Sequence, residues 1–155
     1  MFTETESKLL HVTCKTFQSR KYVFDFLSDP KWKDTGIENW VQIELMAALI
    51  AEGLTVSTIG KKKLNCDLIM KDEKRQCNVG IELETITYPQ YYNYIFIKQG
   101  LEKHVNPEPD MFLFLGRLDE KALTELEKYL KQHNYEEKHQ TLFNDWMVMI
   151  AKRNG

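Results

Sequence analysis

The spacing of apolar residues changes abruptly at Gly53, and this change limits the folds that the chain can adopt. Across Ile37–Ala51 the apolar residues form one broad face at helical spacing, which predicts a helix with Gly53 at its C-cap. Beyond the glycine apolar and polar residues alternate, and many of the residues are β-branched. This pattern predicts an antiparallel meander of short strands joined by charged turns. The strands are expected at 54–59, 64–70 and 76–85, and the turns at 60–63 and 71–74.

The segments on both sides of this meander also have apolar residues at spacings that indicate helices or strands. Helix is predicted over 5–27, in one or two pieces, and again over 89–103. The run 110–115 is almost wholly apolar, as in a strand buried on both faces, and 119–132 is an amphipathic helix. The last apolar stretch, 146–151, fits a closing strand, with a helix as the alternative. This order predicts an α/β fold with a central mixed sheet flanked by helices.

The chain of 155 residues contains no linker-like or repeated segment, so a single domain is expected. It would comprise an N-terminal helical extension (1–36), a core (37–116), and a C-terminal helix with a closing strand (117–155). No apolar run approaches the roughly 20 residues that cross a bilayer, and the first residues do not resemble a secretory signal. Three cysteines without a C-x-x-C pair favour a reducing compartment. We therefore expect a cytoplasmic protein that does not enter a membrane.

Three carboxylates interrupt the predicted strands. Asp67 lies among apolar neighbours, and Glu82 and Glu84 share one face of the next strand because side chains alternate along a strand. Pairing of the two strands would bring Asp67 opposite the glutamates. A single acid on a strand is most often a solvated surface residue, but three that converge repel one another unless a cation neutralises them. The pattern favours a site for Mg²⁺ or Mn²⁺, cations that bind carboxylate oxygens.

A site of this kind is typical of phosphodiester hydrolysis, because a divalent ion activates water and neutralises charge on phosphate oxygens. Glu44, on the preceding helix, could reach the same ion directly or through water. Lys61, Lys62 and Lys63 lie just before the Asp67 strand, where they would bind nucleic-acid phosphates; an ordinary solvated turn explains them equally well. The net charge of −2 argues against strong non-specific binding of nucleic acid, which needs a basic surface.

At these residues the sequence resembles the PD-(D/E)xK nuclease superfamily. Its α-β-β-β-α-β core, the restriction-endonuclease-like fold, carries an acid on the first helix, an aspartate on the second strand and Glu-x-Lys on the third. The corresponding residues here are Glu44, Asp67, Glu82 and Glu84. The resemblance implies a metal-dependent endonuclease with DNA as the favoured substrate and RNA as the alternative, and it assigns the metal to the first three residues. Members with so small a core often form homodimers, although this sequence shows no interface.

Glu84 stands where the family has its lysine. Some type II restriction endonucleases of the superfamily carry the same Glu-x-Glu and cleave DNA, and other members place the lysine on the following helix, where Lys98 is the candidate. On this interpretation Asp67, Glu82, Glu84 and Lys98 form the catalytic set. The missing lysine and the acidic net charge support a second interpretation, a catalytically inactive nuclease-fold module that binds a protein or a nucleic acid.

Overall fold

The computed structural model describes residues 1–27, 29, 31, 37–58, 61–64, 66–86, 99, 102, 108–143 and 146–155. The helices are α1 (Glu4–Ser19), α2 (Lys21–Leu27), α3 (Ile37–Ala51), α4 (Lys61–Leu64) and α6 (Glu120–Gln132). The strands are β1 (Val56–Ser57), β2 (Leu68–Asp72), β3 (Cys77–Ile86), β4 (Met111–Gly116), β5 (Glu137–Phe143) and β6 (Trp146–Lys152). None of the helices in this part of the chain has the length and apolar character that a bilayer crossing requires.

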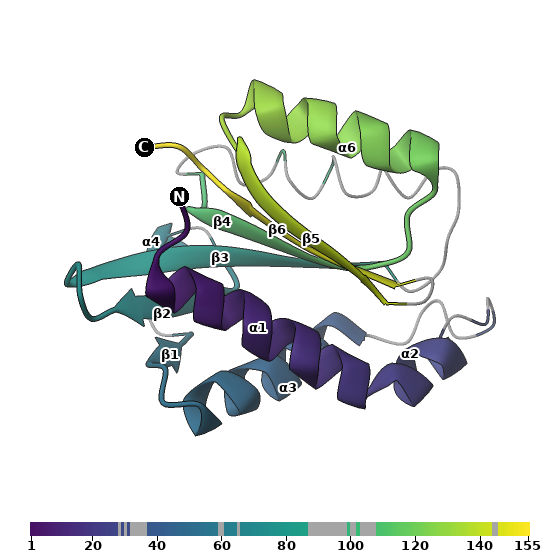
Figure 1. The fold of residues 1–155 in the computed structure, drawn as a ribbon, viewed down its shortest axis with the longest axis horizontal. Helices are drawn as coiled ribbons and strands as arrows, with labels where there is room; N and C mark the ends of the chain where they lie inside the picture. Colours follow the sequence, from purple (N-terminus) through teal and green to yellow (C-terminus); the bar gives the residue numbers. More distant parts are fainter. Residues whose placement is uncertain are drawn as a thin grey trace.

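A single mixed sheet forms the centre of the molecule, with its six strands in the order β1-β2-β3-β4-β6-β5. Neighbouring strands are antiparallel except for β3 and β4, which run parallel. Figure 1 shows α1, α2 and α3 on one face of the sheet and α6 on the other. The predicted α/β architecture, with a mixed sheet between helices and an antiparallel meander of β1, β2 and β3, is confirmed.

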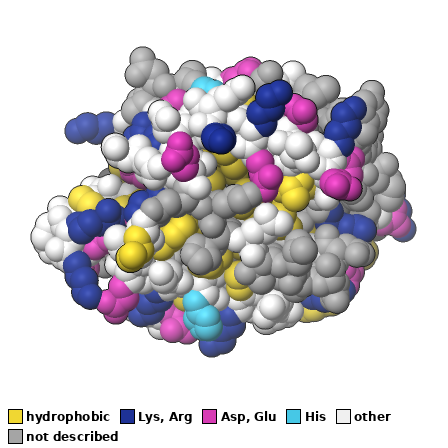
Figure 2. Space-filling view, turned by 45° about the horizontal axis from the view of Figure 1, so that its top comes forward, with side chains coloured by type: hydrophobic (Ala, Val, Ile, Leu, Met, Phe, Trp, Pro, Cys, Tyr) yellow, Lys and Arg dark blue, Asp and Glu magenta, His cyan; other side chains and the backbone are white. Residues whose placement is uncertain are grey.

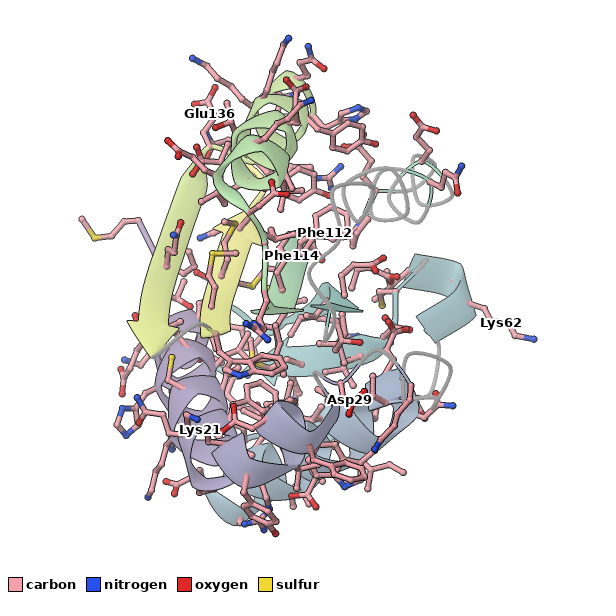
Figure 3. The ribbon with its side chains drawn as sticks, turned by 90° about the vertical axis from the view of Figure 1, so that its right-hand side faces the viewer. Lys21, Asp29, Lys62, Phe112, Phe114 and Glu136 are labelled. Atoms are coloured by element: carbon pink, nitrogen blue, oxygen red, sulfur yellow. The ribbon has the colours of Figure 1, made fainter. Side chains whose placement is uncertain are left out.

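Alternation along the strands divides the apolar side chains between two cores. On β4, Met111, Leu113 and Leu115 belong to the core beneath α1 and α3. Phe112 and Phe114 belong to the core beneath α6, where Figure 3 shows them. All of β4 is therefore buried, as predicted for a strand covered on both faces.

The N-terminal helices are part of the larger core. Phe17 of α1 and Phe24 of α2 are fully buried in it. The ring of Phe24 lies 5.7 Å from that of Trp40 and 4.9 Å from that of Trp146, between centroids. The helix predicted over 5–27 is two pieces, α1 and α2. Segment 1–36 thus contributes side chains to the same core as the sheet.

The boundaries around the second strand differ from the prediction. Residues 61–64, expected as a turn and the start of a strand, form the short helix α4, and β2 begins only at Leu68. Pairing with β3 starts there, with Leu68 opposite Ile81, so the preceding residues lie outside the ladder. β1 is only two residues long because it pairs with just Ile69 and Met70 of β2.

The sequence does not predict β5, which mixes charged and polar residues over Glu137–Phe143. This strand lies at the edge of the sheet and pairs only with β6, a position where charged residues are common because they discourage association with other chains. The stretch 146–151, left open between strand and helix, is strand β6. The helix predicted over 89–103, with Lys98 on it, lies outside the described residues except for Gln99 and Glu102.

Two buried carboxylates join α1 to the sheet. Glu6 is 1% exposed and accepts hydrogen bonds from Arg75 Nη2 at 3.0 Å and Lys152 Nζ at 2.8 Å. Asp72 is equally buried and accepts from Arg75 Nε at 2.8 Å and from the backbone N–H groups of Lys74 and Arg75. We call Glu6, Asp72, Arg75 and Lys152 the ion network. It ties the start of α1 to the β2–β3 turn and to β6.

The cations of the ion network determine how its carboxyls titrate. Burial by itself raises the pKa of Glu6, but hydrogen bonds from Lys152 and from the N–H of Thr3 lower it, as do the charges of Lys152 and Arg75. Burial likewise raises the pKa of Asp72, and hydrogen bonds from Arg75 and its charge lower it. The net pKa of both carboxyls lies below the ordinary value, so both are charged at neutral pH.

Candidate functional site

Asp67 lies in a bend just before β2, where hydrogen bonds to β3 and α3 hold it. Its backbone N–H donates to the carbonyl of Ile81 at 3.0 Å, and its Oδ2 accepts from the N–H of Leu83 at 2.9 Å. Gln42 of α3 donates from Nε2 to the carbonyl oxygen of Asp67 at 3.0 Å. The aspartate is therefore positioned from two directions, by β3 and by α3.

The end of β3 explains why carboxylates gather here. The pairing of β2 with β3 stops at Leu68 and Ile81, so β3 continues past the start of β2. The N–H groups of Leu83 and Thr85 point to that side, because alternate N–H groups of a strand face the same edge. Leu83 donates to Asp67, and Thr85 donates to the carboxylate of Glu38. The carboxylates thus accept hydrogen bonds from backbone N–H groups of β3. If β2 were longer, its carbonyl groups would accept these bonds instead.

Glu82 is buried between these groups, with 5% of its surface exposed. It faces away from Ile81 and Leu83, whose side chains enter the core beneath α1 and α3, and in the ladder it lies beside Phe112 of β4. Burial raises its pKa first, then the negative charges of Asp67, Glu84 and Glu38, and the result is a pKa of about 9. At neutral pH Glu82 is therefore protonated and donates a hydrogen bond to Asp67.

Glu38, at the start of α3, is the acid that the sequence did not indicate. Burial and the charge of Asp67 raise its pKa, and the hydrogen bond from Thr85 opposes them. Gln42 follows it at i+4 and so lies on the same face of the helix, which is how both residues reach the surroundings of Asp67. This spacing is the only local signal that could have identified Glu38. We call Glu38, Asp67, Glu82 and Glu84 the carboxylate cluster.

Glu44, the acid expected on this helix, does not lie in the cluster. It is six residues beyond Glu38, which places it about 240° further around the helix. Its carboxylate instead forms an ion pair with Arg20, with Oε2 at 3.3 Å from Nε, on the side of α3 that faces α1. The structure therefore groups Glu38, and not Glu44, with Asp67 and Glu82. The role of Glu44 as a metal ligand stays a prediction.

The remaining predicted residues lie around the cluster. Glu84 is partly exposed on the same face of β3 as Glu82, and its charge contributes to the raised pKa of Glu82. Lys62 and Lys63 are exposed on α4, and Figure 3 shows Lys62 extending outward from the molecule. The side chain of Lys61 and the whole of Lys98 lie outside the described residues. Figure 2, a view towards the α6 side, shows basic and acidic side chains interspersed over the described atoms.

Cys66 adjoins the cluster as a buried thiol. Burial first, and then the charges of Glu82, Asp67 and Asp110, raise the pKa of its thiol to about 11, while a hydrogen bond with the backbone of Ile81 acts in the opposite direction. Its sulfur lies so close to Gly80 that a Cβ there would be 3.3 Å from Sγ. The thiol therefore stays protonated at neutral pH, and the glycine leaves room for it.

The cluster has the ligand chemistry of a site for a hard cation, since all four side chains offer carboxylate oxygens. Among the described residues, no three or more His, Cys, Asp or Glu side chains are already arranged to hold a metal ion. The hydrogen bond between Glu82 and Asp67 instead places a proton between two of the carboxylates.

Fold and site together define an α/β protein whose mixed sheet carries a carboxylate cluster, with the buried Glu82 at its centre, at the end of one central strand. Comparisons with protein-family models, with curated proteins and with solved structures found no match. The geometry of the cluster is therefore the basis for proposing a function.

Proposed function

We propose that the protein is a divalent-metal-dependent endonuclease that hydrolyses phosphodiester bonds, with DNA as the favoured substrate. The observation that carries the proposal is the convergence of Glu38, Asp67 and Glu82 from α3, the start of β2 and β3. Burial first, and then the like charges of its neighbours, raise the pKa of Glu82 to about 9, and a cation would remove the repulsion between these charges. Mg²⁺ and Mn²⁺ are the cations that best suit oxygen ligands at such a site.

Asp67 and Glu82 would be the principal metal ligands, and Glu38 would support the ion or its water in the place expected of Glu44. Because Glu82 is protonated and donates a hydrogen bond to Asp67, binding of the ion by both carboxylates requires release of that proton. The affinity for the ion should therefore increase with pH until Glu82 is ionised in the free protein, near pH 9. This dependence can be measured by titrating Mn²⁺ at several pH values.

The side chains around the ion would divide the chemistry between them. A bound divalent ion supplies an activated water and neutralises charge on the phosphate oxygens. Glu84, partly exposed beside Glu82, would accept the proton of the attacking water in place of the usual lysine, with Lys98 as a second group. Lys62 and Lys63, exposed on α4 just before Asp67, would contact the phosphates of the substrate.

The order of elements supports the same proposal. α3 is followed by β1, β2 and β3 as an antiparallel meander, and β4 returns parallel to β3. This order is compatible with the α-β-β-β-α-β core of the PD-(D/E)xK nucleases, which the sequence resembles. In that core the acidic residues belong to the first helix, the second strand and the third strand. Here Glu38 is on α3, Asp67 directly precedes β2, and Glu82 and Glu84 are on β3.

A cleavage assay with supercoiled plasmid and with single-stranded RNA, in Mn²⁺ and in Mg²⁺, tests the proposal. Asp67→Asn and Glu82→Gln should each lower the rate by at least about 100-fold, because loss of a residue that only orients a metal ligand already costs about 10–100-fold and loss of the ligand itself costs more. Glu44→Gln is the matched control, since this glutamate is on α3 but pairs with Arg20, and it should retain activity. Cleavage that survives both ligand substitutions would exclude the cluster as the active site.

A second function is favoured by the glutamate at position 84. If Glu84 cannot replace the family's lysine, the protein is an inactive nuclease-fold module that binds a protein or a nucleic acid. The finding that the described carboxylates are not already arranged around a metal site also favours it. This function predicts that nucleic acid binds without cleavage in either metal, and that Asp67→Asn leaves the binding unchanged.

A further inference from the structure

The carboxyl ends of β3 and β4 lie side by side at one end of the sheet. These two strands run parallel, and their last residues, Ile86 and Gly116, are opposite each other (Figure 1). The starts of β2 and β6 point to the same end, because β2 is antiparallel to β3 and β6 is antiparallel to β4. In open α/β sheets, ligands bind beyond the carboxyl ends of parallel strands. This end of the sheet carries Asp67, directly before β2, and Arg117, directly after β4.

Arg117 is close to the carboxylate cluster across the sheet. Thr85, whose N–H donates to Glu38, precedes Ile86 in β3. Arg117 follows Gly116, which lies opposite Ile86. Two Cα steps of about 3.8 Å and one strand spacing of about 4.8 Å limit the separation of the Thr85 and Arg117 Cα atoms to about 12 Å. One DNA strand advances about 3.4 Å per nucleotide, so Arg117 lies a few nucleotides from a phosphate held at the cluster.

The side chain of Arg117 is supported by the start of β6. Its guanidinium carbon lies over the ring of Trp146, 6.0 Å from the centroid, and Trp146 is itself buried. Trp146 Nε1 donates to Asp25 Oδ1 at 3.2 Å. A hydrogen bond from Lys21 first, and then one from Trp146 and the charges of Lys21 and Arg117, lower the pKa of Asp25 against the effect of burial. A guanidinium supported in this way is a planar group of N–H donors, which suits two hydrogen bonds to one phosphate.

Cations lie on two sides of the carboxylate cluster. Lys62 and Lys63 are exposed on α4, which precedes Asp67 and β2. Arg117 follows β4, and β3 lies between β2 and β4 in the sheet. A nucleic-acid strand that crosses this end of the sheet would therefore meet the lysines of α4, then the carboxylates, and then Arg117. Contacts to phosphates on both sides would fix the position of the strand without reading its sequence.

We propose that Arg117 binds a backbone phosphate of the substrate on the side of the cluster away from α4. This inference rests on the proposed function, because it takes nucleic acid as the ligand. A net charge of −2 gives no general attraction for nucleic acid, so binding has to depend on individual cations that the fold holds in place. Arg117 sets the path of the substrate strand and does not touch the bond that is cut.

The salt dependence of DNA binding tests the contact. Fluorescence anisotropy with a short labelled duplex, in a chelator that prevents cleavage, gives the affinity at several salt concentrations. Arg117→Met, which keeps a long side chain against Trp146 but no charge, should lower the slope of log affinity against log salt by about 0.9 and the affinity at about 0.1 M salt roughly eightfold. Arg117→Lys should retain the slope, and Lys121→Met, an exposed change on α6, is the control and should alter neither quantity.

Three results would overturn the proposal. They are a wild type that does not bind the duplex, an unchanged slope in Arg117→Met, and an equal loss of slope in Arg117→Lys, which would mean that the arginine acts only through the fold. Thermal unfolding of each variant shows whether it is folded, and Arg117→Gln provides a second neutral side chain if Arg117→Met is not.

Cleavage kinetics separate this inference from the proposed function. If the wild type cleaves DNA, Arg117→Met should raise KM about eightfold and leave kcat unchanged, because the lost contact is the same in the ground state and the transition state. A lower kcat with an unchanged KM would contradict the assigned role. A wild type that binds the duplex but does not cleave it in either metal would end the nuclease proposal alone, and a reduced slope in Arg117→Met would then still establish the phosphate contact.

Discussion

Two groups of carboxylates in the described part of the chain have buried members: the ion network at the start of α1, with Glu6 and Asp72, and the carboxylate cluster at the end of β3, with Glu82. Burial raises the pKa of Glu6 and of Glu82 alike. In the ion network Lys152 and Arg75 reverse the effect, and in the carboxylate cluster the neighbouring acids add to it. Both carboxylates are buried, so the neighbouring charges decide whether the charged side chain stabilises or destabilises the fold. A buried like-charge cluster is where a function is to be sought.

The two groups should affect stability with opposite dependence on pH. A carboxyl with a lowered pKa, such as Glu6 or Asp72, stabilises the fold above its ordinary pKa and loses that contribution as pH falls. A carboxyl with a raised pKa, such as Glu82, has the reverse effect. Its folded form binds the extra proton between the ordinary pKa of 4.5 and about 9, so stability declines as pH rises through that interval.

The largest effect is expected from Glu6→Ala, which breaks the ion network. Removal of a buried acid leaves Lys152 and Arg75 without their shared partner and should lower the free energy of unfolding by about 3 kcal/mol. Urea denaturation at pH 7 measures it. Glu4→Ala is the matched control, because Glu4 is in the same helical turn but pairs with Lys74 at the surface, and it should change stability little. Equal effects of the two substitutions would show that the ion network does not stabilise the fold.

Glu82→Gln should have the opposite sign. At pH 8 the substitution should raise the free energy of unfolding by about 2 kcal/mol, because glutamine needs no proton to be neutral in the cluster. At pH 4 the difference should vanish, since Glu82 is then protonated in both the folded and the unfolded chain. Urea denaturation of both proteins at pH 4, 6 and 8 measures this. A gain that does not depend on pH would mean that the cost of ionising Glu82 in the folded chain is not its cause.

Mn²⁺ should stabilise the wild type through the carboxylate cluster. An ion at ten times its dissociation constant raises the free energy of unfolding by about 1.4 kcal/mol when it binds only the folded chain. Thermal unfolding at pH 8 with and without Mn²⁺ measures this shift, which should be absent in Asp67→Asn and retained in Glu44→Gln. Stabilisation of Asp67→Asn equal to that of the wild type would place the ion elsewhere.

The smallest effect is expected from Gln42→Ala, which removes a neutral hydrogen bond from Asp67. The free energy of unfolding should fall by about 1 kcal/mol, the usual contribution of one such bond, and 0.5 M salt should not change the difference. If Asp67 is a metal ligand, the affinity for Mn²⁺ should fall as well. Asn39→Ala, an exposed change on the same helix, should alter neither quantity. A salt-dependent loss in Gln42→Ala would point to an ionic role instead.

Local spacing was sufficient for several features of the fold and the cluster. α3, α6 and β3 lie within a residue or two of their predicted positions, because helix and strand periods are properties of consecutive residues. Glu82 faces away from Ile81 and Leu83, as strand alternation predicts. Edge strand β5 could not be found in this way, since its polar sequence depends on a partner, β6, and not on burial of its own face.

What the sequence determined by itself is most of the described elements, with α4 and β5 as the exceptions, and the face of β3 that carries Glu82 and Glu84. Only the tertiary structure decided which other residues meet that face. β2 begins at Leu68 because its pairing with β3 begins there, and the N–H groups of β3 that remain donate to Asp67 and Glu38. The same packing turns Glu44 towards Arg20. These positions depend on contacts between residues that are distant in the chain. The spacing of apolar and polar residues along the sequence does not show such contacts.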